Sequence, residues 1–140
     1  MKNIFYTSAI MLCLTSPAFA ADVVIDIKNI QSNEGEIGCA LFANATGFPM
    51  ESPKSAQQWQ KANKSGMQCK FENVKSGSYA VSVVHDLNRN YKTDTNFVGI
   101  PTEAWGVSNN ARPSLRAPTF DEAKFEVDGQ KNTTIIVEIE

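Results

Sequence analysis

The stretch Gly77–Asp86, GSYAVSVVHD, decides the fold class, because its side chains alternate in character along an extended segment. The residues that share one face of this segment are Tyr79, Val81, Val83 and His85. Alternation with a period of two, after a Ser-Gly turn signal, predicts a strand that packs one face on a core. The sheet therefore fixes where the polar residues that follow His85 begin.

The same alternation recurs along the chain, in segments 23–28, 37–41, 67–71, 123–127 and 135–139. Short one-sided strands separated by turn signals predict an all-β antiparallel sandwich rather than alternating strands and helices. Segment Ser55–Ala62 differs, because it follows Pro53 and contains neither Gly nor Pro. It is predicted to form one short helix.

Length and charge exclude several classes of protein. The chain has 140 residues, 13 Lys plus Arg against 15 Asp plus Glu, and a formal charge of −2. A nucleic-acid-binding protein needs a concentrated basic face, and no block of like charges offers one. The length fits a single domain.

Residues 1–20, MKNIFYTSAIMLCLTSPAFA, show the three parts of a secretory signal peptide. A positive Lys2 precedes an apolar run, and Ala18-Phe19-Ala20 is a small-x-small cleavage site. The apolar run is shorter than the about 20 residues that a membrane span needs. We therefore expect a periplasmic or secreted protein whose single domain covers residues 21–140, with no membrane span after cleavage.

Export changes the meaning of the three cysteines. Cys13 leaves with the signal peptide, whereas Cys39 and Cys69 remain in an oxidising compartment. Alternation places both on the apolar faces of their strands, which favours a disulfide across the core. The alternative is two separate buried thiols. A redox-active pair is not expected, because no C-x-x-C spacing is present.

A loop rich in oxygen donors follows the strand at 77–86 and suggests calcium as a cofactor. The candidate ligands are Asp86, Asn88, Asn90, the Lys92 carbonyl and Asp94. Calcium prefers several hard oxygen ligands at alternate positions of a tight loop. Two positions depart from the usual calcium loop, however: Tyr91 replaces a glycine and Phe97 replaces a bidentate glutamate. The metal-free alternative is a polar turn in which Asp and Asn cap backbone amides.

The residues after this loop suggest a recognition surface. The candidate ligand-binding residues are His85, Glu103, Trp105, Asn109 and Asn110. Trp105 offers a face on which a ligand can stack. The alternative is that Trp105 covers the open end of the core and that Glu103 is solvated or pairs with an arginine.

Three functions are compatible with these residues. The leading hypothesis is an exported binding or accessory module for an unknown protein or small-molecule ligand, with its working surface at residues 85–110. The second is a small hydrolase-type enzyme that uses His85 with Glu103 or Ser108, although no nucleophile motif supports it. The third is a structural subunit of an envelope complex, which predicts an exposed apolar patch or an unpaired sheet edge at the final strand, Thr134–Glu140.

A family resemblance covers nearly all of the chain after the signal peptide. The segments that carry it are Gly77–Asn90, Asp94, Gly99–Asn110 and Ala117–Phe125. In this order they resemble the exported bacterial family named domain of unknown function 2141. The resemblance implies a transthyretin-like (prealbumin-like) Greek-key β-sandwich of seven strands, and it implies no activity. Where the family's loop commonly has a glycine, this chain has Tyr91.

Overall fold

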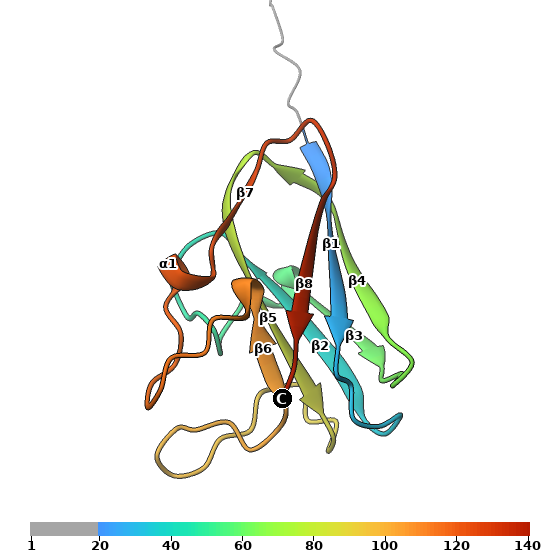
Figure 1. Ribbon diagram of the computed structural model, residues 1–140, viewed down its shortest axis with the longest axis vertical. Coiled ribbons are helices and arrows are strands. Elements are labelled where there is room, and N and C mark those ends of the chain that lie inside the picture. The colour runs from blue at the N-terminus through green and yellow to red at the C-terminus, as the bar shows by residue number, and fades with distance from the viewer. Residues whose placement is uncertain (1–19) are drawn as a thin grey trace, which may run out of the picture.

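The computed structural model describes residues 20–140 and shows two facing β-sheets (Figure 1). Its strands are β1 (Ala20–Lys28), β2 (Glu36–Phe42), β3 (Gln57–Lys61), β4 (Met67–Lys75), β5 (Gly77–Asp86), β6 (Trp105–Val107), β7 (Phe125–Val127) and β8 (Thr133–Glu138). Its helical turns are η1 (Lys54–Ala56), η2 (Ser108–Asn110) and α1 (Phe120–Ala123). The predicted signal peptide lies outside the described residues except for Ala20.

The all-β, two-sheet architecture is confirmed. One sheet has the order β4-β1-β8, and the other has the order β3-β2-β5-β6, with β7 also paired to β5. Eight strands are present among residues 20–140, where seven were expected. The antiparallel prediction is wrong for one pair, because β8 runs parallel to β1. The chain enters β8 at the end of the sandwich where β1 begins, so both strands point the same way (Figure 1).

The core lies between the two sheets and follows the alternation of the sequence. Val23, Ile25 and Ile27 of β1 are fully buried, and so are Val81 of β5 and Val137 of β8. Each such side chain contributes about 1.5–3 kcal/mol when it leaves water. A second, smaller cluster around Ala80, Val107 and Ala123 packs on the outer face of the five-stranded sheet.

The prediction of a helix at Ser55–Ala62 is wrong. Only the short turn η1 is helical there, and the following residues form β3, which pairs antiparallel with β2. The side chains of β3 alternate between two faces, and each face has its own contacts. The indole of Trp59 lies against Gly38 on the outer face, whereas Gln58 and Gln60 reach in the opposite direction toward β4.

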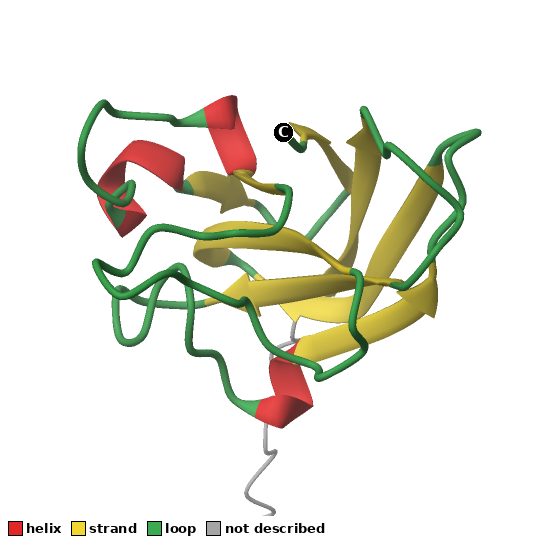
Figure 2. Cartoon of the chain, turned by 90° about the horizontal axis from the view of Figure 1, so that it is seen from below, coloured by secondary structure: helices red, strands yellow, loops and turns green. Residues whose placement is uncertain are grey.

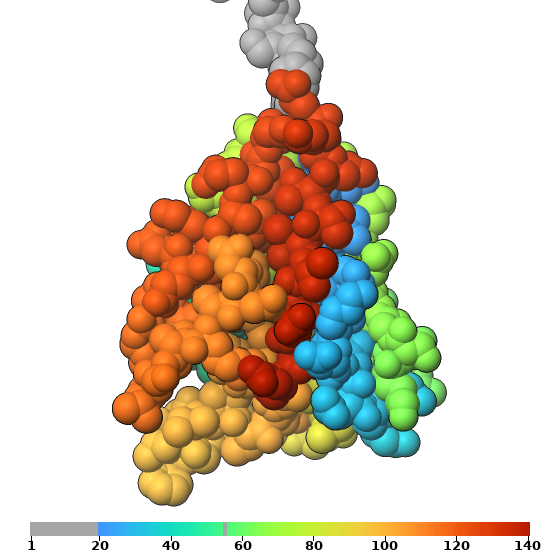
Figure 3. Space-filling view, in the orientation of Figure 1, coloured from blue at the N-terminus to red at the C-terminus, as the bar shows by residue number. Residues whose placement is uncertain are grey.

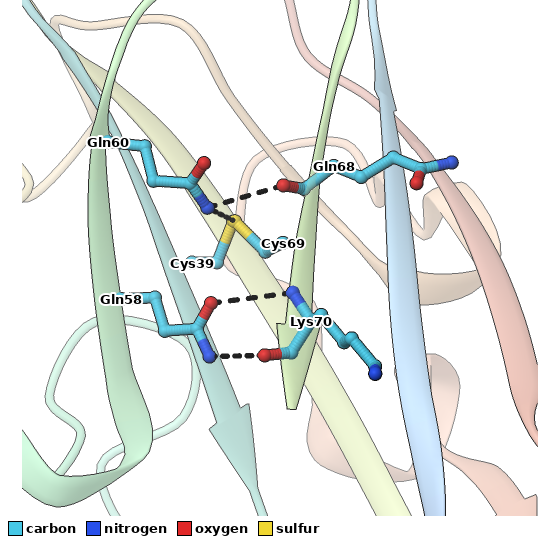
Figure 4. Close-up of a disulfide and its surroundings, with 6 residues drawn as sticks. All are labelled: Cys39, Gln58, Gln60, Gln68, Cys69 and Lys70. Atoms are coloured by element: carbon cyan, nitrogen blue, oxygen red, sulfur yellow. Dashed lines mark hydrogen bonds between the residues drawn. A yellow bond between two sulfur atoms is a disulfide. The ribbon is translucent and has the colours of Figure 1, made fainter. Parts of the chain in front are cut away.

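A disulfide and two glutamines join the two sheets at the β3–β4 side (Figure 4). The predicted bond between Cys39 of β2 and Cys69 of β4 is confirmed. The side-chain amide of Gln58 accepts from the backbone N–H of Lys70 and donates to its carbonyl. The amide of Gln60 donates to the carbonyl of Gln68 at 3.2 Å. The two glutamine side chains therefore form hydrogen bonds with backbone groups on the outer edge of β4.

The opposite side of the sandwich is joined where β6 meets the end of the chain. Trp105 and Glu140 exchange two backbone hydrogen bonds of 3.2 Å. The side chain of Asn110 accepts the backbone N–H of Glu138 at 2.9 Å. The edge predicted to be unpaired at Thr134–Glu140 is therefore covered at Glu138 and Glu140.

Removal of the disulfide should destabilise the fold without changing its topology. The bond joins residues separated by 30 positions. Closing such a loop contributes about 3–4 kcal/mol by restricting the unfolded chain. We expect the double variant Cys39→Ala, Cys69→Ala to lose about this free energy of unfolding in urea denaturation. A loss below about 1 kcal/mol would show that apolar packing alone holds the sheets together.

Candidate functional site

Two long connections gather at the end of the sandwich where β5 finishes. They are residues 87–104, between β5 and β6, and residues 111–119, between η2 and α1. Figure 2, which views this end from below, shows the connections as green loops over the sheets. In Figure 3 the tip of the first connection and the neighbouring part of the second lie next to each other at the lower left.

Asp86 anchors the first connection. Its carboxylate is fully buried and accepts three backbone N–H groups, from Arg89 at 2.7 Å, Asn90 at 3.3 Å and Tyr91 at 2.7 Å. Arg89 and Tyr91 both have positive φ angles, of 60° and 61°, so the chain coils tightly around this carboxylate. Backbone amides of a strained turn thus take up both oxygens of Asp86.

Asp94, near the middle of the first connection, bonds back to residues at its start. Its two oxygens accept the side-chain amides of Asn88 at 2.5 Å and Asn90 at 2.8 Å. These two hydrogen bonds lower the pKa of the Asp94 carboxyl below its ordinary value. The amide oxygens of Asn88 and Asn90 accept backbone N–H groups within the loop instead.

The predicted calcium ligands are therefore brought together, but their oxygens are engaged in hydrogen bonds. The asparagines present amide nitrogens to Asp94, and both oxygens of Asp86 face backbone donors. Within residues 20–140 no group of three or more His, Cys, Asp or Glu side chains is arranged to hold a metal ion. This arrangement does not fit a bound calcium ion and favours the metal-free interpretation of the loop.

Glu103 holds the loop against the sheet. Its carboxylate accepts the backbone N–H of Leu87 at 3.0 Å and that of Asp94 at 3.2 Å. It thus ties the start of the loop to its end, rather than pairing with an arginine.

His85 and Ser108 make their hydrogen bonds to the backbone. His85 is 2% exposed, and its Nε2 donates to the carbonyl of Glu34 at 2.8 Å. Ser108 is fully buried, accepts the N–H of Val81 at 2.9 Å and donates to Ala123 at 2.6 Å. Neither side chain bonds to the other or to Glu103, so the described contacts assemble no nucleophile and base.

The predicted ligand-binding residues of 105–110 also make contacts within the fold. Asn109 donates to the carbonyls of Glu122 and Lys124 at 3.2 and 3.0 Å, which ties η2 to the end of α1. The guanidinium of Arg112 lies 4.4 Å from the ring centroid of the half-buried Trp105. Trp105 thus remains partly accessible, beside a fixed cation.

An apolar cavity of about 370 Å³ lies between the two connections, and we call it the loop hollow. Its walls are residues 98–101, 112–113 and 115–117, with Met50 and Trp105 at its sides. Phe97 and Leu115 are completely exposed near it. In the sequence, Phe97 was noted only because it replaces the bidentate glutamate of a calcium-binding loop. The uncharged run at 95–101, apolar from Phe97 to Pro101, was the signal available for this surface.

A second cavity, of about 220 Å³, lies on the outer face of the five-stranded sheet, and we call it the sheet hollow. Its floor comes from β2 and β5, and its walls include Trp59 of β3 and residues 91–93 of the first connection. Sequence reasoning did not single out Trp59, because it placed this residue in a helix.

Two ion pairs hold the second connection in place. Arg112 pairs with Glu140 at 2.7 Å, and Arg116 pairs with Glu122 at 2.7 Å. Thr119 caps α1 and exchanges hydrogen bonds with Glu122 in a capping box. Arg116 first, and then Thr119, lower the pKa of Glu122 from 4.5 to about 2.

Calcium should leave the stability of the protein unchanged. The oxygens that a calcium ion needs are occupied in the folded loop, so binding would have to break hydrogen bonds. A native-state site at 100 times its dissociation constant would add about 2.7 kcal/mol. We expect the same melting temperature in millimolar calcium and in chelator, measured by circular dichroism. A rise of several degrees with calcium would revive the calcium hypothesis.

The Glu122 ion pair should make stability depend on acid. Because its pKa is lowered on folding, its contribution is complete above about pH 4.5 and is lost as the pH falls toward about 2. Melting temperatures of the wild type and Glu122→Gln should therefore differ most near neutral pH and converge in acid. A difference that stays constant between pH 6 and 2 would contradict the ion-pair role.

No helix within residues 20–140 is long and apolar enough to cross a membrane.

Comparison with known proteins identifies the family of the chain. No curated protein and no solved structure matches the chain. Residues 25–136 match the family model described as "Uncharacterized protein conserved in bacteria (DUF2141)". The resemblance seen in the sequence is thus confirmed, and the chain belongs to the bacterial DUF2141 family.

Proposed function

We propose that the protein is exported to the periplasm and serves there as a binding module, with the loop hollow as its contact surface. One observation carries this proposal: large exposed apolar side chains gather at one end of the sandwich. The exposed ones at this end are Leu87, Tyr91, Phe97, Val98, Ile100 and Leu115. Large exposed apolar patches mark interaction sites in folded proteins.

The edges of the sheets are poor binding surfaces, which also favours the loop end as the place where a partner binds. Gln58 and Gln60 form hydrogen bonds with backbone groups on the edge of β4, and Asn110 accepts one from the backbone of β8. A partner that adds a strand needs a row of free backbone groups at a sheet edge. The loop end offers side chains instead, which favours recognition through an apolar hollow.

The proposed occupant is an apolar segment of another envelope protein. The hollow is concave, so it accepts a protruding side chain, and the exposed Leu115 in its wall can cover that side chain. Arg112 and Arg116 are neutralised by Glu140 and Glu122, which favours an uncharged anchor. Trp and Arg in fixed positions are typical of the residues that dominate binding energy at protein interfaces.

We also propose a specific topology for the two-sheet fold. We propose a transthyretin-like sandwich with seven strand positions. Its support is that β6 and β7 pair with different halves of β5, at Ser82–Val84 and Gly77–Tyr79. They thus act as one interrupted strand beside β5, which would reconcile eight strands with a seven-strand plan. The Greek-key connectivity rests on the family resemblance.

Site-specific photocrosslinking in the bacterium that makes the protein tests the binding surface. A photoreactive amino acid replaces the exposed Ser114, beside the loop hollow, and a matched control replaces the exposed Gln130 in the turn before β8. We expect a discrete protein adduct from position 114 only, and its loss when Ile100→Ser is added. Ile100 lines the hollow and is 59% exposed, so this change should leave the fold intact.

Each other result would count against the proposal. An adduct that survives Ile100→Ser would place the partner elsewhere. An adduct with a second copy of the chain, or with lipid, would replace the envelope protein as the occupant. Sequencing of the protein released by osmotic shock tests export, with Ala21 expected as its first residue.

A further inference from the structure

The sheet hollow has a floor of small side chains in the middle of a sheet. Gly38 and Ala40 of β2 and Ser82 of β5 occupy outer-face positions, and all three line the cavity together with Val84 of β5. Ala40 and Ser82 are directly paired across the two strands. Gly and Ala are depleted from strands because they leave little to pack. A glycine inside a strand often marks a place that another group approaches closely.

Trp59 is the group that approaches Gly38. A Cβ atom built on Gly38 would lie 2.5 Å from two atoms of the indole ring, so any larger residue would displace that ring. The indole Nε1 donates to the side chain of Gln57 at 3.2 Å. Gln57 in turn donates to the carbonyl and hydroxyl oxygens of Ser52, at 2.9 and 3.0 Å. A chain of hydrogen bonds therefore fixes the ring in the wall of the hollow.

Tyr91 completes the aromatic part of this wall. Its ring meets that of Trp59 edge to face, with centroids 5.3 Å apart and planes at 85°. The backbone N–H of Tyr91 is held by the buried carboxylate of Asp86. The polar loop that looked like a metal site thus positions one wall of the hollow.

Four polar side chains around the hollow have no partner in the described part of the chain. Glu51, Ser82, Lys92 and Thr93 all line it. Within residues 20–140, none of their side-chain N or O atoms takes part in a hydrogen bond or an ion pair. Other surface charges, such as Lys70 and Lys124, do form ion pairs. The hollow therefore combines an aromatic wall with free donors and a free acceptor.

We propose that the sheet hollow binds one sugar ring. The C–H faces of a pyranose are apolar and stack on an aromatic ring, while its hydroxyl groups donate and accept hydrogen bonds at the rim. Trp59 supplies the stacking surface, and Ser82 and Lys92 face the cavity with free donors. At about 220 Å³ the cavity is smaller than the about 300–1,000 Å³ of pockets for drug-sized ligands, so it suits one ring.

The charges in the wall argue against ionic ligands. An organic cation would meet Lys92, and an anion would meet Glu51. A neutral polyhydroxylated ring accepts hydrogen bonds from the ammonium and donates them to the carboxylate. The sheet hollow adjoins the loop hollow, since Met50 lines both, but the other residues that line the two hollows differ.

Nuclear magnetic resonance titration of the ¹⁵N-labelled protein tests the proposal. The probes are glucose, galactose, mannose and N-acetylglucosamine, with choline as a cationic comparator. We expect at least one sugar to shift the amide signals of Gly38, Ala40 and residues 91–93, with a dissociation constant in the millimolar range. Choline should not shift these signals.

Three variants locate the binding. Trp59→Ala should weaken sugar binding about tenfold or more, through loss of the stacking surface. Ser82→Ala removes one hydroxyl from the floor and should weaken binding several-fold while preserving the sheet. Trp105→Phe is the matched control, because Trp105 lies in the loop hollow, and it should bind as the wild type does.

Several results would overturn the proposal. They are the absence of shifts with all four sugars, shifts that persist undiminished in both Trp59→Ala and Ser82→Ala, and shifts by choline alone. If Trp59→Ala does not give a dispersed spectrum, Ser82→Ala alone decides the outcome. Sugar binding together with a failed crosslink at Ser114 would separate this inference from the proposed function.

Discussion

The bond between Cys39 and Cys69 crosses the core and joins the two sheets covalently. Most of the contact between the sheets is apolar and non-directional, so it fixes their separation better than their alignment. The disulfide joins β2 to β4, and the amides of Gln58 and Gln60 repeat the connection beside it. Together they set the position of β3, and with it the position of Trp59 above the sheet. In a domain of this size, a few kcal/mol from one crosslink is a large share of the total stability.

Two carboxylates, the buried Asp86 and the partly exposed Glu103, order the loop end in a comparable way. Asp86 and Glu103 between them accept the backbone N–H groups of five residues, from Leu87 to Asp94. Hydrogen bonds to charged acceptors are stronger than neutral ones, which suits a connection with little regular structure. The polar residues that seemed suited to chemistry thus build the scaffold. The surfaces proposed for binding depend more on aromatic and aliphatic side chains, with polar groups such as Lys92 and Arg112 beside them.

The strands and the disulfide were predictable because both depend on local alternation. Cys39 and Cys69 each sit between two apolar residues of the same face, and this pattern does not depend on the rest of the fold. Segment 55–62 was not predictable in the same way. Its glutamines have no apolar alternation, and its strand exists because β2 and the edge of β4 supply partners. Tertiary contacts override local propensity in such segments.

The roles of the candidate site residues also depend on tertiary contacts, which the sequence does not show. Glu103 and Asn109 were predicted to bind a ligand, whereas in the structure their side chains form hydrogen bonds with backbone groups distant in the sequence. Neither hollow was visible in the sequence, because each combines segments far apart along the chain, such as Gly38 with Tyr91.

The parallel pairing of the first strand with the last has a consequence for how the molecule forms. Both neighbours of β1 in its sheet, β4 and β8, come later in the chain. The register joins Val23 to Thr133, so this contact spans most of residues 20–140. Proteins dominated by such non-local pairings fold slowly, because the chain must close large loops before it gains contacts. The edge of β1 that pairs with β8 therefore stays open until β8 has been added.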